Sequence, residues 1–199
     1  MILLPALLAG LLAGWLASKW HGSAWQLPQL QHTWLVLIFF LPQFFAFYLP
    51  ATRTHLSTLA AATCLVTSQI GLLLFCLVNP RLPGMPLLTV GLSFNLLAVI
   101  TNGGLMPIST ITAGKLIPAS LLANISVGAR FSPASKDILL LPEMINLPWL
   151  SDRFVGPSWI PYRFAYSLGD LLISTGVFLL LALPNSQRKV HKNVNQPVI

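Results

Sequence analysis

The sequence has 199 residues, of which 55% are hydrophobic and only 8% are charged. About a quarter of the residues in an ordinary soluble domain are charged, so this composition excludes that class and indicates a membrane protein. The formal charge of +7 does not indicate a nucleic-acid partner, because the basic residues are scattered singly except in the tail, at Arg188, Lys189 and Lys192. We expect an all-α polytopic transmembrane helical bundle whose main surroundings are the lipid bilayer.

Five apolar segments approach the length of about 20 residues that a helix needs to cross a bilayer. The second contains Pro42 and Gln43 and the fourth is short, so we expect these two to be kinked, broken or buried by their neighbours. The five expected spans are residues 2–18, 34–49, 56–78, 87–101 and 164–183. The chain therefore divides into four spans within residues 1–101, a long segment at 102–163, a fifth span at 164–183 and a polar basic tail at 184–199.

The first expected helix carries a Gly-x-x-x-Gly pattern, formed by Gly10 and Gly14 and flanked by alanines. Small residues on one face let two helix backbones approach closely. Helices rich in Gly and Ala also produce this pattern by chance. It predicts a close helix contact without identifying the partner.

The basic residues predict an orientation. With five spans, Lys19, Arg81 and the basic tail fall on one face, whereas the only short loop of the other face carries Arg53. Cytoplasmic loops are usually the more basic ones, so we expect the N-terminus outside and the C-terminus in the cytoplasm. The segment 102–163 then lies outside, between spans four and five.

This outer segment is too long for a plain connector, and its Leu, Ile and Trp content argues against disorder. We expect it to form an ordered cap. A helix can start at Ser109 or Thr110 and is interrupted by Gly114 and Pro118, so this piece would either lie along the membrane interface or re-enter the bilayer. Three of the four acidic residues also fall in the segment, at Asp137, Glu143 and Asp152.

A turn motif ends the fourth expected span. In Thr101-Asn-Gly-Gly-Leu-Met-Pro107, the glycines permit positive φ and the proline stops a helix. The motif is either a helix cap and turn or a loop that docks a ligand or another loop. Asn95 lies seven residues before Asn102, near the same helix face, and extends the polar stripe. The candidate residues are Asn95, Asn102, Gly103, Gly104, Met106 and Pro107.

Asp170 lies inside the last apolar segment, where an ionisable side chain is costly unless it faces protein, water or a partner. Arg163 and Ser167 precede it at helical spacings, and the helix N-terminus itself favours a carboxylate. Two roles remain open. Asp170 either anchors the outer segment to the bundle together with Arg163, or it serves as a proton or cation site.

The chain resembles a family of bacterial integral membrane proteins of unknown function, DUF5317. The resemblance depends on the motifs at residues 102–107 and 167–170, and on the intervening Ser135-Lys136 and the sequence at residues 147–152. It covers most of the chain, from the first helix to the end of the last span. It implies a multi-pass protein of the bacterial inner membrane and implies no activity.

Catalytic signatures are weak. Gly91-Leu-Ser-Phe-Asn95 lacks the final glycine of a nucleophile elbow, and the four histidines have no metal-binding spacing. We therefore expect no enzyme activity, no metal and no cofactor. Two function classes remain. The preferred one is a non-catalytic structural or accessory subunit that packs against other membrane proteins. The alternative is a protein that binds or transports a small molecule, lipid or quinone beneath the cap, at Asn95, Asn102 and Asp170.

Overall fold

A computed structural model describes residues 2–20, 22 and 26–183, and this part of the chain is mostly helical. The predicted polar tail at 184–199 lies outside the described residues. The long helices are α1 (Leu3–Trp20), α2 (Trp34–Gln43), α4 (Thr58–Val78), α5 (Met85–Thr101) and α8 (Leu168–Ala182). A π-helical turn, η1 (Phe44–Tyr48), continues α2, and a short α3 (Pro50–Arg53) follows it.

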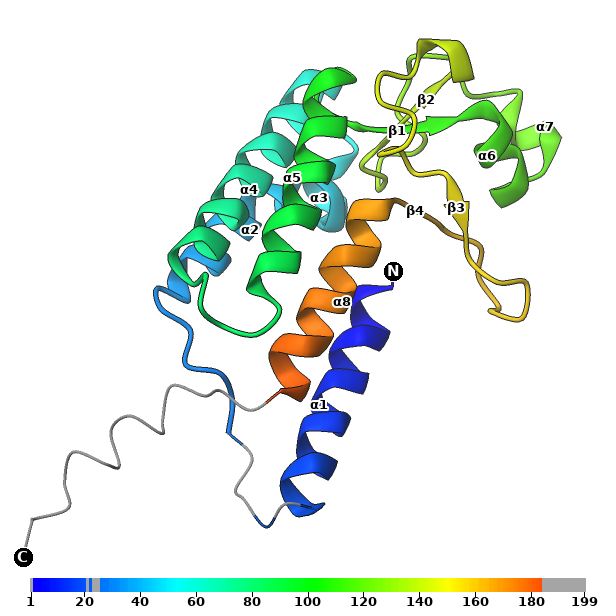
Figure 1. Ribbon diagram of the computed structural model, residues 1–199. Coiled ribbons are helices and arrows are strands. Elements are labelled where there is room, and N and C mark those ends of the chain that lie inside the picture. The colour runs from blue at the N-terminus through cyan, green and yellow to red at the C-terminus, as the bar shows by residue number, and fades with distance from the viewer. Residues whose placement is uncertain (1, 21, 23–25, 184–199) are drawn as a thin grey trace, which may run out of the picture.

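The long helices form one row in which α2 packs against α4, α4 against α5, α5 against α8 and α8 against α1. They alternate in direction along the chain, and the non-helical elements gather at one end of the row (Figure 1). By length and composition, α1 and α4 are candidate membrane-spanning helices, whereas α2 with η1, α5 and α8 are shorter. Each of the five expected apolar segments thus contains a helix, and two of these helices have the length of a span.

Proline and glutamine are accommodated in the second apolar segment. Pro42 lies near the end of α2, and the wider η1 turn begins two residues later. A proline removes one backbone hydrogen bond and displaces the preceding turn, which suits a change of helix type at this point. Ser68 of α4 donates a hydrogen bond to Gln43 Oε1 at 3.1 Å, so the glutamine has a polar partner inside the bundle.

Glycines set the closest helix contacts. A Cβ at Gly91 of α5 would lie 2.7 Å from the carbonyl oxygen of Gly169 in α8, and one at Gly10 of α1 would lie 3.0 Å from the carbonyl oxygen of Phe178. Gly10 and Gly14 are both buried. The small-residue face of α1 therefore packs on α8 of the same chain, which is the partner that the Gly-x-x-x-Gly pattern left open.

The segment between α5 and α8 contains strands that the all-α prediction did not include. The reason is that each strand is only two to four residues long, too short for a recognisable alternation of apolar and polar side chains. β1 (Met106–Ser109) pairs in parallel with β2 (Asp137–Leu140), and β3 (Phe154–Val155) pairs antiparallel with β4 (Ala165–Tyr166). The other elements are α6 (Thr110–Leu116), α7 (Ala119–Leu122) and the 3₁₀ turn η2 (Pro142–Met144).

We call residues 102–167 the cap. Its α6 begins where Ser109 accepts a hydrogen bond from the Thr112 backbone N–H, in accord with the predicted helix start. Both α6 and α7 belong to the strand-containing part at the end of the helix row (Figure 1).

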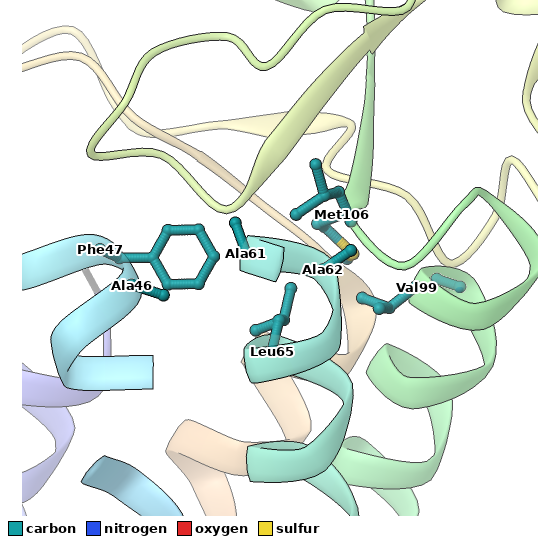
Figure 2. Close-up of a cluster of buried hydrophobic side chains, with 9 residues drawn as sticks. Ala46, Phe47, Ala61, Ala62, Leu65, Val99 and Met106 are labelled. Carbon is teal, nitrogen blue, oxygen red and sulfur yellow. The ribbon is translucent and has the colours of Figure 1, made fainter. Parts of the chain in front are cut away.

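A buried apolar cluster joins the cap to the helices. Its members come from η1, α4, α5 and the start of the cap, and Figure 2 shows several of them converging where these elements meet. Leu105 and Met106 of the cap are fully buried in it, and Ile138 and Leu150 pack against its edge. Burying such side chains contributes about 1.5–3 kcal/mol each, so the cap is a packed part of the fold.

Candidate functional site

Asp170 begins α8 as half of a capping box. Ser167 precedes the helix, and its Oγ accepts a hydrogen bond from the Asp170 backbone N–H at 3.0 Å. The Asp170 carboxylate accepts from the Ser167 backbone N–H at 3.4 Å. This exchange satisfies two N–H groups that a helix start leaves without partners, and the positive end of the helix dipole favours the carboxylate.

Asn95 links this helix start to α5. Its Nδ2 donates to Asp170 Oδ1 at 2.7 Å, and its Oδ1 accepts from Ser167 Oγ at 2.8 Å. Asn95 and Ser167 are buried, and the Gly91–Gly169 approach brings the two helices close enough for both bonds. The structure therefore brings Asn95, Ser167 and Asp170 into one hydrogen-bonded network.

Lys136 is the cation that faces Asp170. Its Nζ lies 3.6 Å from Asp170 Oδ2, and the two side chains are 31% and 23% exposed, so solvent reaches the pair. Arg163, the expected partner, instead donates to the Lys115 carbonyl oxygen at 2.9 Å. Arg163 lies before the N-terminus of α8, between β3 and β4, so helical spacing does not apply to it.

Two further carboxyl groups lie beside Lys136 because of how β1 pairs. Met106 of β1 is opposite Asp137 on β2, and Ile108 forms an isolated bridge with Asp152. The Asp152 backbone N–H donates to the Pro107 carbonyl oxygen at 3.1 Å. One short strand therefore positions both acids on its two sides, and each interacts electrostatically with Lys136.

Burial and the neighbouring charges shift the pKa values of Lys136, Asp137 and Asp152. Burial alone would lower the pKa of Lys136, but the surrounding carboxylates outweigh it and the pKa lies above its ordinary value. Burial raises the pKa of Asp137 and raises that of Asp152 much more strongly, with Lys136 opposing both shifts. We call Asn95, Lys136, Asp137, Asp152, Ser167 and Asp170 the junction site, because they connect the cap to α5 and α8.

The turn motif at residues 102–107 has a different place. Asn102 Nδ2 donates to the Asn146 carbonyl oxygen at 2.8 Å, and Asn102 Oδ1 accepts from the Asn146 backbone N–H at 2.9 Å. Asn102 thus links the end of α5 to the cap through hydrogen bonds, and it forms no hydrogen bond with Asn95.

The glycines of this motif differ in what surrounds them. Both have positive φ, but a Cβ at Gly104 would lie 2.7 Å from Ala62 Cβ, whereas one at Gly103 would meet nothing within 4 Å. Met106 and Pro107 are fully buried. These four residues therefore shape the helix end and anchor the cap, and the backbones of Met106 and Pro107 also bond to those of Lys136 and Asp152.

Lys136, Asp137 and Asp152 were not among the candidate site residues from sequence. The scarcity of acidic residues was the signal that could have indicated these aspartates. The sequence has only four acidic side chains, of which three belong to the junction site and the fourth is Glu143. Among the described residues, no group of three His, Cys, Asp or Glu side chains is placed to hold a metal ion.

Comparison with known proteins identifies the family. Residues 28–182 match the model of DUF5317, described as a family of unknown function, so the chain belongs to this family. The resemblance seen in the sequence motifs is confirmed. Comparisons with curated proteins and with solved structures gave no match.

Proposed function

We propose, from the junction site, that this member of DUF5317, a family of unknown function, is a polytopic membrane protein that binds or transports a small molecule beneath its cap. The observation that carries the proposal is the Lys136–Asp170 pair, which joins the cap to the start of α8 and is partly open to solvent. Ionisable groups at such a position in a membrane protein mark binding or transport sites more often than lipid contacts.

The hydrogen-bonding capacity of the Lys136 ammonium indicates which ligand chemistry suits the site. A lysine ammonium has three N–H donors, and among the described residues one carboxylate oxygen lies within 4.0 Å of Lys136 Nζ. A ligand with an oxygen acceptor, such as a lipid headgroup or a quinone carbonyl, would bond to Lys136, while its apolar part lies along the helices. Asn95 and Ser167 fix the orientation of Asp170, so they hold the site in shape.

The accessory subunit, which is the class preferred from the sequence, would pack against another membrane protein through the small-residue face of its first helix. That face is occupied by α8, and the outward face of α1 presents Leu4, Leu8 and Leu12. Such a leucine surface suits lipid as well as a partner helix, so it does not favour a partner protein.

The proposal includes an orientation in the bacterial inner membrane. The alternating helices support five spans with the cap outside. The basic residues Lys19, in the last turn of α1, and Arg81, after α4, lie at the opposite end from the cap. The three helices shorter than a usual span cross a bilayer that is thinned around them or lie within the protein.

A topology experiment tests this arrangement. A reporter fused after Ile199 should read cytoplasmic, and one inserted next to Ser135 in the cap should read external, because the cap and the C-terminal end of α8 lie at opposite ends of the helix row. Reporters that give the same side would contradict the five-span arrangement.

A binding experiment tests the site. The full chain is purified from membranes in mild detergent, and native mass spectrometry identifies retained small molecules and proteins. We expect the wild type and Arg163→Gln to retain the same small molecule, and Asp170→Asn to lose it, because the amide keeps an acceptor for Asn95 but removes the charge that faces Lys136. A stoichiometric partner protein with no small molecule would favour the accessory-subunit alternative.

A further inference from the structure

We propose that Asp137 and Asp152 form a proton-binding pair in which one proton is shared between the buried carboxyl of Asp152 and the half-buried carboxyl of Asp137, beside Lys136. The proposal concerns the charge of the cap and does not require the ligand proposed above. It therefore has a test of its own.

Unsatisfied oxygens are the first observation. Asp137 Oδ1 and Asp152 Oδ1 are both buried, and neither receives a hydrogen bond from a donor group among the described residues. Asp152 is only 2% exposed, so water does not supply the missing donor at its surface. A buried acceptor without a partner costs about 1–3 kcal/mol, and more when it is charged.

The positions of the Asp137 and Asp152 carboxyl groups allow a shared proton to supply the missing hydrogen-bond donor. Asp137 pairs with Met106 and Asp152 with Ile108, and these two residues of β1 share one face of the strand, so the two carboxyl groups lie on the same side and interact with each other. Two ionised carboxylates have no proton to share and repel each other, whereas one proton between them creates an O–H donor and an acceptor. A proton delivered by hydronium, which leaves as water, therefore binds as the hydroxyl of Asp152 and is donated to Asp137.

The second oxygen of Asp137 shows why Asp137 is the acceptor of the pair. Ser135 Oγ donates to Asp137 Oδ2 at 2.6 Å, a bond that favours the ionised form. Asp152 has no such donor on its carboxylate among the described residues. In accord with this asymmetry, burial raises the pKa of Asp152 well above its usual value and raises that of Asp137 less strongly.

The surrounding charges explain why the site takes a proton. Lys136, directly before β2, and Asp170 on α8 face the pair, and Tyr48 of η1 interacts with Lys136. Arg130, which bridges to β2 through Ile138, stacks over Phe47 and donates to the Pro133 carbonyl oxygen. The ammonium of Lys136 opposes a metal cation but allows a neutral O–H. With the proton bound, the pair and Asp170 present two negative charges to Lys136; without it they present three.

Infrared spectroscopy of the purified full chain tests the proposal directly. The sequence has only four side-chain carboxyl groups, so the C=O stretch of a protonated carboxyl can be assigned by substitution. At about pH 7, where an ordinary carboxyl is fully ionised, we expect a protonated carboxyl band equivalent to one group per chain. It should be absent from Asp152→Asn, whose amide N–H takes the place of the shared proton.

Glu143→Gln is the matched control, since Glu143 is an exposed acid of the same cap and should leave the band unchanged. Asp137→Asn, which removes the acceptor, should shift or abolish the band and provides a second variant if Asp152→Asn does not fold. A wild-type spectrum with no protonated carboxyl at neutral pH would overturn the proposal without any variant. A band lost only in Glu143→Gln would overturn it as well.

Discussion

Gly169→Ala should lower the stability of the folded chain by roughly 3 kcal/mol or more, combining overpacking with the loss of buried hydrogen bonds. The new methyl group would lie 2.7 Å from the Gly91 carbonyl oxygen and would collide with Asn95 Oδ1. Neither neighbour can yield cheaply, because one is backbone and the other accepts the Ser167 hydrogen bond. Thermal unfolding in mild detergent, followed by circular dichroism, measures the loss.

Gly114→Ala is the matched control. Gly114 also lies in a helix, but a Cβ there would be 3.7 Å from Leu122 Cδ2, which is ordinary van der Waals contact. This substitution should be neutral or stabilise the chain by up to about 1 kcal/mol, because Ala favours helix more than Gly. Equal unfolding temperatures for the two variants would show that α5 and α8 do not touch through Gly169.

The helices of this fold could be predicted from sequence because each apolar segment is long enough to carry its own signal. The expected start at residue 87 was two residues late, since Gly84 with φ of 82° and Pro86 begin α5 at Met85. The expected start at residue 164 was early. The chain there still forms β4, and Ser167 caps the helix that follows.

The junction site could be predicted only in part, for a reason of topology. Asp170 and Ser167 belong to the same helix start. An ionisable residue such as Asp170 can be recognised in an apolar segment, because placing its charge in lipid is costly. Lys136 reaches Asp170 because β2 pairs in parallel with β1, and a pairing of four residues leaves no pattern in the sequence. Asn95 was a candidate, but its bond to a residue 75 positions away depends on two glycines meeting across helices.

Lys136→Met should destabilise the chain at neutral pH by about 1–3 kcal/mol, a value reduced for the partial exposure of the ion pair. The substitution keeps the apolar stem and removes the ammonium that interacts with all three carboxyl groups of the junction site. Asp170 then keeps Asn95 and Ser167 as donors but has lost its counter-charge. Lys115→Met, at an exposed cap lysine with no carboxylate within ion-pair distance among the described residues, should have little effect.

The pH dependence separates this electrostatic effect from lost packing. In the wild type, the raised pKa of Lys136 means that the folded state holds this proton more tightly than the unfolded state. That stabilisation is present at neutral pH and is lost only as the pH rises through the alkaline range. In Lys136→Met the carboxyl groups lose their cation, so the folded variant takes up protons that the unfolded chain does not hold. Its stability relative to wild type should recover as the pH falls from about 8 towards about 5.

Unfolding temperatures of both proteins across this range test the prediction, and Lys136→Met combined with Asp170→Asn should regain part of the loss at neutral pH because it removes an unpaired charge. A deficit that stays constant with pH and is not relieved by Asp170→Asn would mean that Lys136 contributes only through its stem. The pairing of cap and helix start would then be a matter of packing alone, and the charge would not hold the cap in place.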